Sequence, residues 1–139
     1  MNINLNITKE FLASWDNRKL LEGIIHFGDE ETVRQIINTL SSITTELEDD
    51  LNVRLVEAFD ILREDYYKAS GLKCDPYTDP DTDTRVRSFR DYFLGERYTS
   101  WALDSITTSI DVIDGITALL LDIRRILSIA ESRLANLQQ

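Results

Sequence analysis

The sequence predicts an all-α protein: an elongated three- or four-helix bundle built on a long antiparallel helical hairpin, with a short extended N-terminal arm. Three observations lead to this prediction. Apolar residues between Leu103 and Leu137 recur at the 3.6-residue period of a helix. Residues 30–69 contain neither glycine nor proline. The whole chain of 139 residues has only five glycines and two prolines, fewer than loop-rich or all-β proteins use. We treat residues 1–139 as one domain, a size that can bury a single core.

The N-terminal arm, residues 1–7, alternates asparagine with Ile3, Leu5 and Ile7. In an extended segment such alternation places the three apolar side chains on one side. We therefore expect an arm that lies in a groove of a neighbouring subunit. The alternative is a frayed chain end, which is common in proteins.

A first helix is expected over residues 8–27, with Thr8 as its N-cap. Its apolar residues form one face with Phe11, Trp15, Leu21 and Ile25, and a second with Leu20 and Ile24. Gly28 occupies the position after the helix where a positive φ is expected. Asp29 then caps the next helix, so the two helices should meet at a sharp corner.

A second helix is expected over residues 30–69, and Gly71 with Leu72 should form a Schellman-type ending. A straight helix of that length would extend about 60 Å. That exceeds the diameter of about 40 Å expected for a compact domain of this size. The helix therefore either bends near residues 41–45 or makes the molecule elongated.

An acidic loop over residues 73–84 precedes a third helix over 85–138, for which Gly95 and Gly115 are candidate breaks. The apolar arc of the last stretch is roughly 200° wide, compared with ~100° for an ordinary surface helix. Val112, Leu119, Ile126 and Leu137 widen it beyond what one neighbouring helix covers. We predict that these residues, with those of the arm, contact a protein partner.

The formal charge of −10 and the pI near 4.5 make nucleic acids and anionic membranes poor partners. The single cysteine, Cys74, excludes an intramolecular disulfide. The N-terminus shows no secretory signal, and the longest apolar run, residues 118–121, is far too short for a membrane span. We expect a cytoplasmic protein without a cofactor.

Carboxylates at i, i+3 spacing on facing helices can bind divalent metals, and two pairs have this spacing: Glu57 with Asp60, and Asp111 with Asp114. Both pairs lie opposite the apolar faces. The glutamate–histidine motifs of di-iron bundles are missing, because His26 is the only histidine. We favour a solvated acidic face over a metal site.

Asp79, Asp81 and Asp83 match the opening of a calcium-binding loop. The glycine and glutamate that complete such a loop are replaced by Thr84 and Arg90. We therefore interpret these aspartates as turn-forming residues. The nearby arginines are expected to form ion pairs with them.

The sequence thus favours a non-enzymatic helical protein that acts through protein–protein association and forms homo-oligomers. Such a protein would be an assembly factor, an adaptor, or an inhibitor of the immunity type. One alternative is a metal-dependent all-α nucleotide hydrolase that uses the helix-borne carboxylates. Another is an acidic mimic of nucleic acid.

Overall fold

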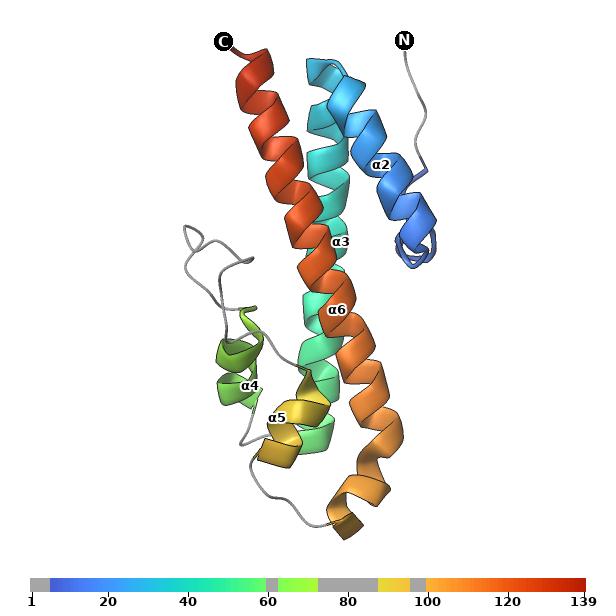
Figure 1. The fold of residues 1–139 in the computed structure, drawn as a ribbon, viewed down its shortest axis with the longest axis vertical. Coiled ribbons are helices and arrows are strands. Elements are labelled where there is room, and N and C mark those ends of the chain that lie inside the picture. Colours follow the sequence, from blue (N-terminus) through green and yellow to red (C-terminus); the bar gives the residue numbers. More distant parts are fainter. Residues whose placement is uncertain (1–5, 60–62, 73–87, 96–99) are drawn as a thin grey trace. The chain divides into compact units, whose positions relative to one another are not determined.

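The computed structural model describes residues 6–59, 63–72, 88–95 and 100–139 (Figure 1). These residues form helices and connecting turns, without a strand among them, which confirms the all-α prediction. The helices are α1 (Lys9–Leu12), α2 (Trp15–Phe27), α3 (Glu30–Phe59), α4 (Arg63–Ser70), α5 (Phe89–Gly95) and α6 (Ser100–Leu137).

The chain divides into two compact units. The terminal unit comprises residues 1–47 and 122–139, and the central unit comprises residues 48–121. Both α3 and α6 supply residues to each unit. Within each unit a stretch of α3 lies beside an antiparallel stretch of α6, which confirms the predicted helical hairpin (Figure 1).

The terminal unit begins with two helices where the sequence predicts one over residues 8–27. Thr8 caps α1 as expected, because its Oγ1 accepts a hydrogen bond from the Phe11 amide at 3.0 Å. The helix then stops, and Ser14 caps α2 by accepting from the Asn17 amide at 3.4 Å. Carbonyl oxygens left open at the end of α1 accept from side chains: Asn17 Nδ2 donates to the Phe11 oxygen and Arg18 Nη1 to the Leu12 oxygen. These local bonds compensate for the interrupted helix.

The corner between α2 and α3 contains Gly28 and Asp29. Asp29 caps α3 as predicted, since its Oδ1 accepts from the Thr32 amide at 2.8 Å. The predicted positive φ of Gly28 is wrong, because its φ is −75°. A Cβ at this position would lie 2.9 Å from the Ile24 carbonyl oxygen and 3.3 Å from Val33 Cγ2. Glycine is needed here for close packing, not for a left-handed backbone.

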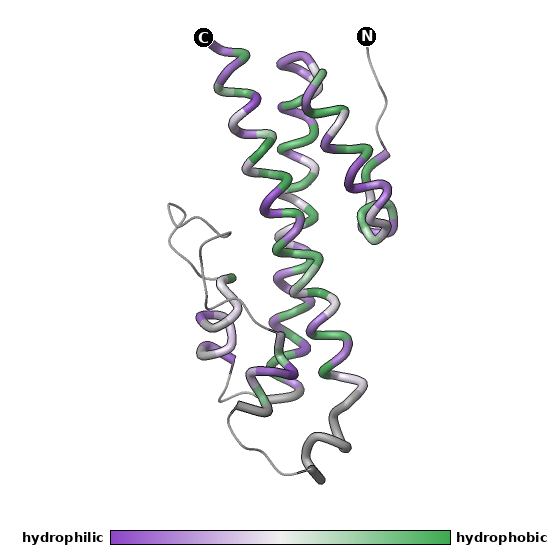
Figure 2. Tube along the Cα trace, viewed as in Figure 1, coloured by the Kyte–Doolittle hydropathy of each residue, from purple (hydrophilic) through white to green (hydrophobic). Residues whose placement is uncertain are grey.

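The core of the terminal unit is built from one face of each helix. Figure 2 shows the hydrophobic stripes that α2, α3 and α6 contribute. Its buried apolar side chains are Leu12, Leu21, Ile25, Val33, Ile36, Leu40, Ile43, Leu47, Ile123, Ile126 and Ala130, together with Ile7 from the segment before α1.

In the central unit α3 is described to Phe59 and α4 from Arg63, and residues 60–62 of the helix predicted over 30–69 lie outside the described residues. The predicted Schellman ending of α4 is confirmed. Gly71 has a φ of 82°, the Leu72 amide donates to the Tyr67 oxygen at 3.1 Å, and the Gly71 amide donates to the Lys68 oxygen at 3.3 Å.

An aromatic cluster forms part of the core of the central unit. Tyr66 of α4 lies edge-on to Phe89 of α5, with ring centroids 5.0 Å apart. Tyr92 and Phe93 extend the cluster, and both are buried. The Tyr66 hydroxyl shares a 2.5 Å hydrogen bond with Thr117 Oγ1, and Thr117 in turn donates to the Ile113 carbonyl of α6.

Of the two candidate breaks in the third predicted helix, α5 ends at Gly95 but α6 continues through Gly115. The predicted break at Gly115 is therefore wrong. Gly115 lies on the exposed side of α6, and a Cβ there would meet nothing within 4 Å. Its neighbours Ile113 and Thr117 are buried. Packing of these flanking residues outweighs the glycine penalty of about 1 kcal/mol.

Candidate functional site

The helix-borne carboxylates do not form a metal site among the described residues. Glu57 is exposed, and Asp111 accepts from Arg90 Nη2 at 2.6 Å. Asp60 and the loop aspartates Asp79, Asp81 and Asp83 lie outside the described residues. In the part of the chain that the structure describes, no three histidine, cysteine or acidic side chains are close enough to share an ion.

Asp114 has a structural role at the start of α5. Its carboxylate accepts hydrogen bonds from the amides of Phe89 and Arg90. Burial raises the pKa of this carboxyl above its usual value, and the two amide bonds partly offset that effect. The i, i+3 spacing of Asp111 and Asp114 thus reflects that both carboxylates of α6 bind residues of α5.

The predicted interaction residues of α6 are largely covered by the chain itself. Ile126 is fully buried, while Val112, Leu119 and Leu137 are half-buried. In the arm, Ile7 is buried at 8% exposure, and Ile3 and Leu5 lie outside the described residues. The wide apolar arc of α6 therefore meets neighbours from its own chain in both units.

Large exposed apolar side chains occur instead on α2 and α3. On α2, Trp15 is 60% exposed, Leu20 57% and Phe27 86%. On α3, Val53 is 52% and Val56 39% exposed. The sequence grouped Trp15 with Leu21 and Ile25 on one face, but Leu21 and Ile25 are buried and Trp15 is not. Trp15 lies about 80° around the helix from Ile25, beyond the polar positions of Arg18 and Glu22.

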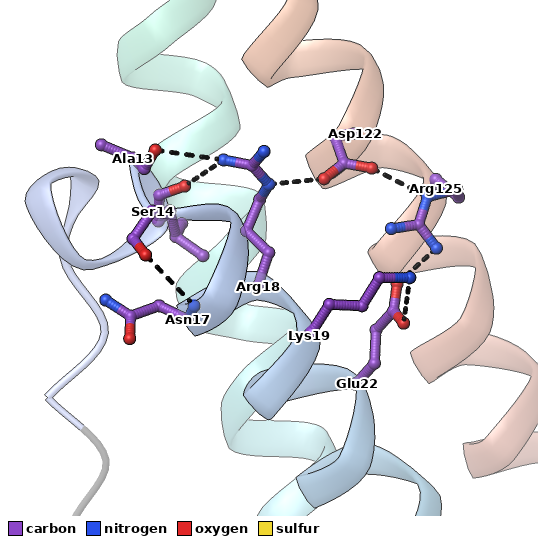
Figure 3. Close-up of polar contacts among 9 residues, drawn as sticks. Ala13, Ser14, Asn17, Arg18, Lys19, Glu22, Asp122 and Arg125 are labelled. Atoms are coloured by element: carbon purple, nitrogen blue, oxygen red, sulfur yellow. Dashed lines mark hydrogen bonds and ion pairs between the residues drawn. The ribbon is translucent and has the colours of Figure 1, made fainter.

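Those polar positions hold α2 on α6 through a chain of four charged side chains, the α2–α6 clamp, and Lys19 Nζ lies 3.4 Å from Glu22 Oε2 at the end of this chain (Figure 3). Arg18 Nε lies 2.5 Å from Asp122 Oδ2, and Asp122 Oδ1 accepts from Arg125 Nε at 2.8 Å. Arg125 also pairs with Glu22. All four side chains are partly buried, with exposures between 17% and 36%. The clamp fixes the rotation of α2, so Leu21 and Ile25 face inward.

The exposed side of α2, which starts beside Glu22, is a mixed apolar and polar surface. We define the outer face of α2 as Trp15, Asp16, Lys19, Leu20, Gly23, His26 and Phe27, which are all exposed. Lys19 Nζ lies 5.4 Å from the centre of the Trp15 ring, a cation–π distance. The rings of His26 and Phe27 meet edge to face at 5.7 Å. A Cβ at Gly23 would meet nothing within 4 Å.

Open hollows also occur among the described residues, and one of them reaches the outer face of α2 at His26. One of about 340 Å³ is lined by His26, Ser128, Ile129, Ser132, Arg133 and Asn136. Arg133 is occupied there, since its Nη2 donates to the Gly28 carbonyl at 3.2 Å. The other, of about 230 Å³, is lined by Glu48, Asp49, Asn52, Tyr67 and Leu72. Burial, followed by the negative charge of Glu48, raises the pKa of the Tyr67 hydroxyl. That hydroxyl is therefore not poised to act as a base at neutral pH.

Comparisons with family models, with curated proteins and with solved structures find no match. None of the described helices combines the length and apolarity needed to cross a membrane.

Sequence reasoning missed the outer face of α2 because it grouped Trp15 with Leu21 and Ile25 on one apolar face. Two signals were available. Ser14 is a preferred N-cap residue placed just before Trp15. Arg18 and Glu22 lie on the same side of the helix as the expected apolar face. A charged pair at that position indicates that a second helix with complementary charges lies against it.

Proposed function

We propose that this protein is a non-enzymatic helical protein that acts through protein–protein association, and that it associates through the outer face of α2. One observation carries the proposal. Trp15, Leu20 and Phe27 are more than half exposed on the outer face of α2. Such a protein would be an assembly factor, an adaptor or an inhibitor.

The exposed aromatic area is large enough to contribute to binding. Trp15 and Phe27 are 60% and 86% exposed, which corresponds to roughly 300 Å² of ring surface. Burying that surface contributes about 7 kcal/mol before association costs. The loss of translational and rotational freedom opposes it by about 4–15 kcal/mol. Contacts from the rest of the outer face are therefore required as well.

The composition of the face also resembles that of binding surfaces. Tryptophan and other aromatic residues are enriched among the residues that dominate interface energetics. On α2 the aromatic residues are interspersed with Asp16, Lys19 and His26, whose polar groups can orient a bound partner. The carboxylates that a hydrolase would need are engaged in ion pairs and helix capping at Asp111 and Asp114, which favours binding over catalysis.

Photo-crosslinking in the native host tests this proposal. Phe27 is replaced by the photoreactive benzoylphenylalanine, and Val53, which is also exposed but lies on α3, is replaced in a matched control. We expect defined crosslinked products from position 27 that decrease when Gly23→Arg is added, and few from position 53. Equal products from both positions, or none from position 27, would contradict the proposal.

A further inference from the structure

We infer that the outer face of α2 binds the same face of a second copy of this chain, with the two α2 helices antiparallel. This inference rests on the proposed function, because it names the partner for the surface proposed there. Three features of α2 lead to a second copy: the order of its residues, its net charge and its exposed glycine.

The residue order is self-complementary. Consider two antiparallel α2 helices whose midpoints lie at Leu21. A residue that precedes Leu21 in one helix then lies level with the residue that follows Leu21 by the same number of positions in the other. Trp15 then lies level with Phe27 of the second copy, and Asp16 level with His26. The first turn of one helix, which carries Asp16, therefore lies beside the last turn of the other helix, which carries His26. A parallel pair would instead place Asp16 beside Asp16, and like charges repel.

The zero formal charge of α2 limits the electrostatic repulsion between two copies at this helix. The chain carries a formal charge of −10, so two copies repel each other over most of their surfaces. Helix α2 has two acidic residues, Asp16 and Glu22, and two basic residues, Arg18 and Lys19, so its formal charge is zero. A strongly cationic partner would gain little from this neutral helix. The neutral helix thus favours a copy of itself over a basic protein.

The exposed glycine fits close contact between two helices. Gly23 lies mid-helix on the outer face, and a Cβ there would meet nothing in its own chain. Internal packing therefore does not require glycine, although glycine destabilises a helix interior by about 1 kcal/mol relative to alanine. In the antiparallel pair Gly23 lies level with Lys19 of the second copy. The absence of a side chain leaves room for that lysine, which contacts Trp15 and Glu22 of its own chain.

The size of the face predicts a weak dimer. One face of a 13-residue helix buries an area near the lower limit of specific interfaces, about 1,000 Å² in total. We therefore expect a dissociation constant on the order of 10–100 µM. The protein should be monomeric when dilute and dimeric when concentrated.

Sedimentation across that concentration range tests the dimer with a matched pair of variants. Gly23→Arg and Gly115→Arg each place a good helix former at an exposed helical glycine with open space around it. We expect both variants to unfold at the wild-type temperature or above. Gly23→Arg should weaken dimerisation at least ~10-fold, whereas Gly115→Arg should leave it unchanged.

Disulfide crosslinking tests the orientation. Starting from Cys74→Ser, which removes the native cysteine, proteins carrying Lys19→Cys and Gly23→Cys are oxidised alone and as a mixture. Antiparallel pairing predicts heterodimers in the mixture and few homodimers. Homodimers of each protein alone would indicate parallel pairing and overturn the inference.

The remaining outcomes separate this inference from the proposed function. A wild-type protein that stays monomeric at all concentrations overturns the dimer. If position 27 then photo-crosslinks to a different protein, the proposed function stands with another partner. If it crosslinks to nothing, both fail. A dimer that persists in Gly23→Arg lies on another surface and also overturns the inference.

Discussion

Single glycines in this chain show how one residue type serves opposite purposes. At Gly28 a Cβ would lie 2.9 Å from the Ile24 oxygen, so the tight corner between α2 and α3 excludes any side chain. At Gly23, five residues earlier, the surrounding space is open. Folding requires glycine at position 28 but not at position 23. Packing within the folded chain therefore does not explain the glycine at position 23, whereas contact with a partner does.

This contrast makes a pair of substitutions informative. Gly28→Ala should lower the free energy of unfolding by about 1–3 kcal/mol, because the Ile24 carbonyl or Val33 must shift to admit the methyl group. Gly23→Ala should raise it by up to about 1 kcal/mol through helix propensity alone. Urea denaturation of dilute protein measures both. A Gly28→Ala protein as stable as wild type would show that the corner is looser than the structure describes.

At the scale of elements, the structure depends on how each helix begins and is held. Apolar periodicity was sufficient to predict the helices and the hairpin, because a stripe of Val33, Leu40 and Leu47 suits no other regular structure. Helix boundaries depend on local side-chain bonds, such as Ser14 to Asn17, that compete with continuing the helix. Periodicity carries no information about that competition, so the break before α2 was missed.

The clamp determines which side of α2 faces outward, and it can be tested by removing its central carboxylate. Asp122→Ala leaves both Arg18 and Arg125 without that acceptor in a partly buried site. We expect a loss of about 1–3 kcal/mol in the free energy of unfolding, below the cost of breaking a fully buried pair.

The control for the clamp is Asp50→Ala, which removes an exposed pair with Arg54, 3.7 Å apart on α3. Exposed pairs of this kind contribute little, so its effect should stay within about 0.5 kcal/mol. If the two substitutions had equal effects in the same denaturation experiment, the clamp would not be what holds α2 on α6.

At the scale of the molecule, the sequence predicts association through α6 and the N-terminal arm, whereas we propose association through the outer face of α2. It assigned the partner surface to α6 because a single 200°-wide arc exceeded what one neighbour covers. Each unit supplies more than one neighbour: α2 and α3 in the terminal unit, and α3, α4 and α5 in the central unit. Ile126 is buried as a result. The exposed surface is set by which faces remain uncovered, and that depends on tertiary packing.

The fluorescence of Trp15 tests most directly whether the outer face of α2 becomes buried on association. Trp101→Phe leaves Trp15 as the single tryptophan, 60% exposed in the isolated chain. Between about 1 and 500 µM, a range that brackets the expected dissociation constant, we expect its emission maximum to shift to shorter wavelength as the ring leaves water. Adding Gly23→Arg should abolish the shift. An emission maximum that stays constant over the whole range without Gly23→Arg would contradict self-association through this face.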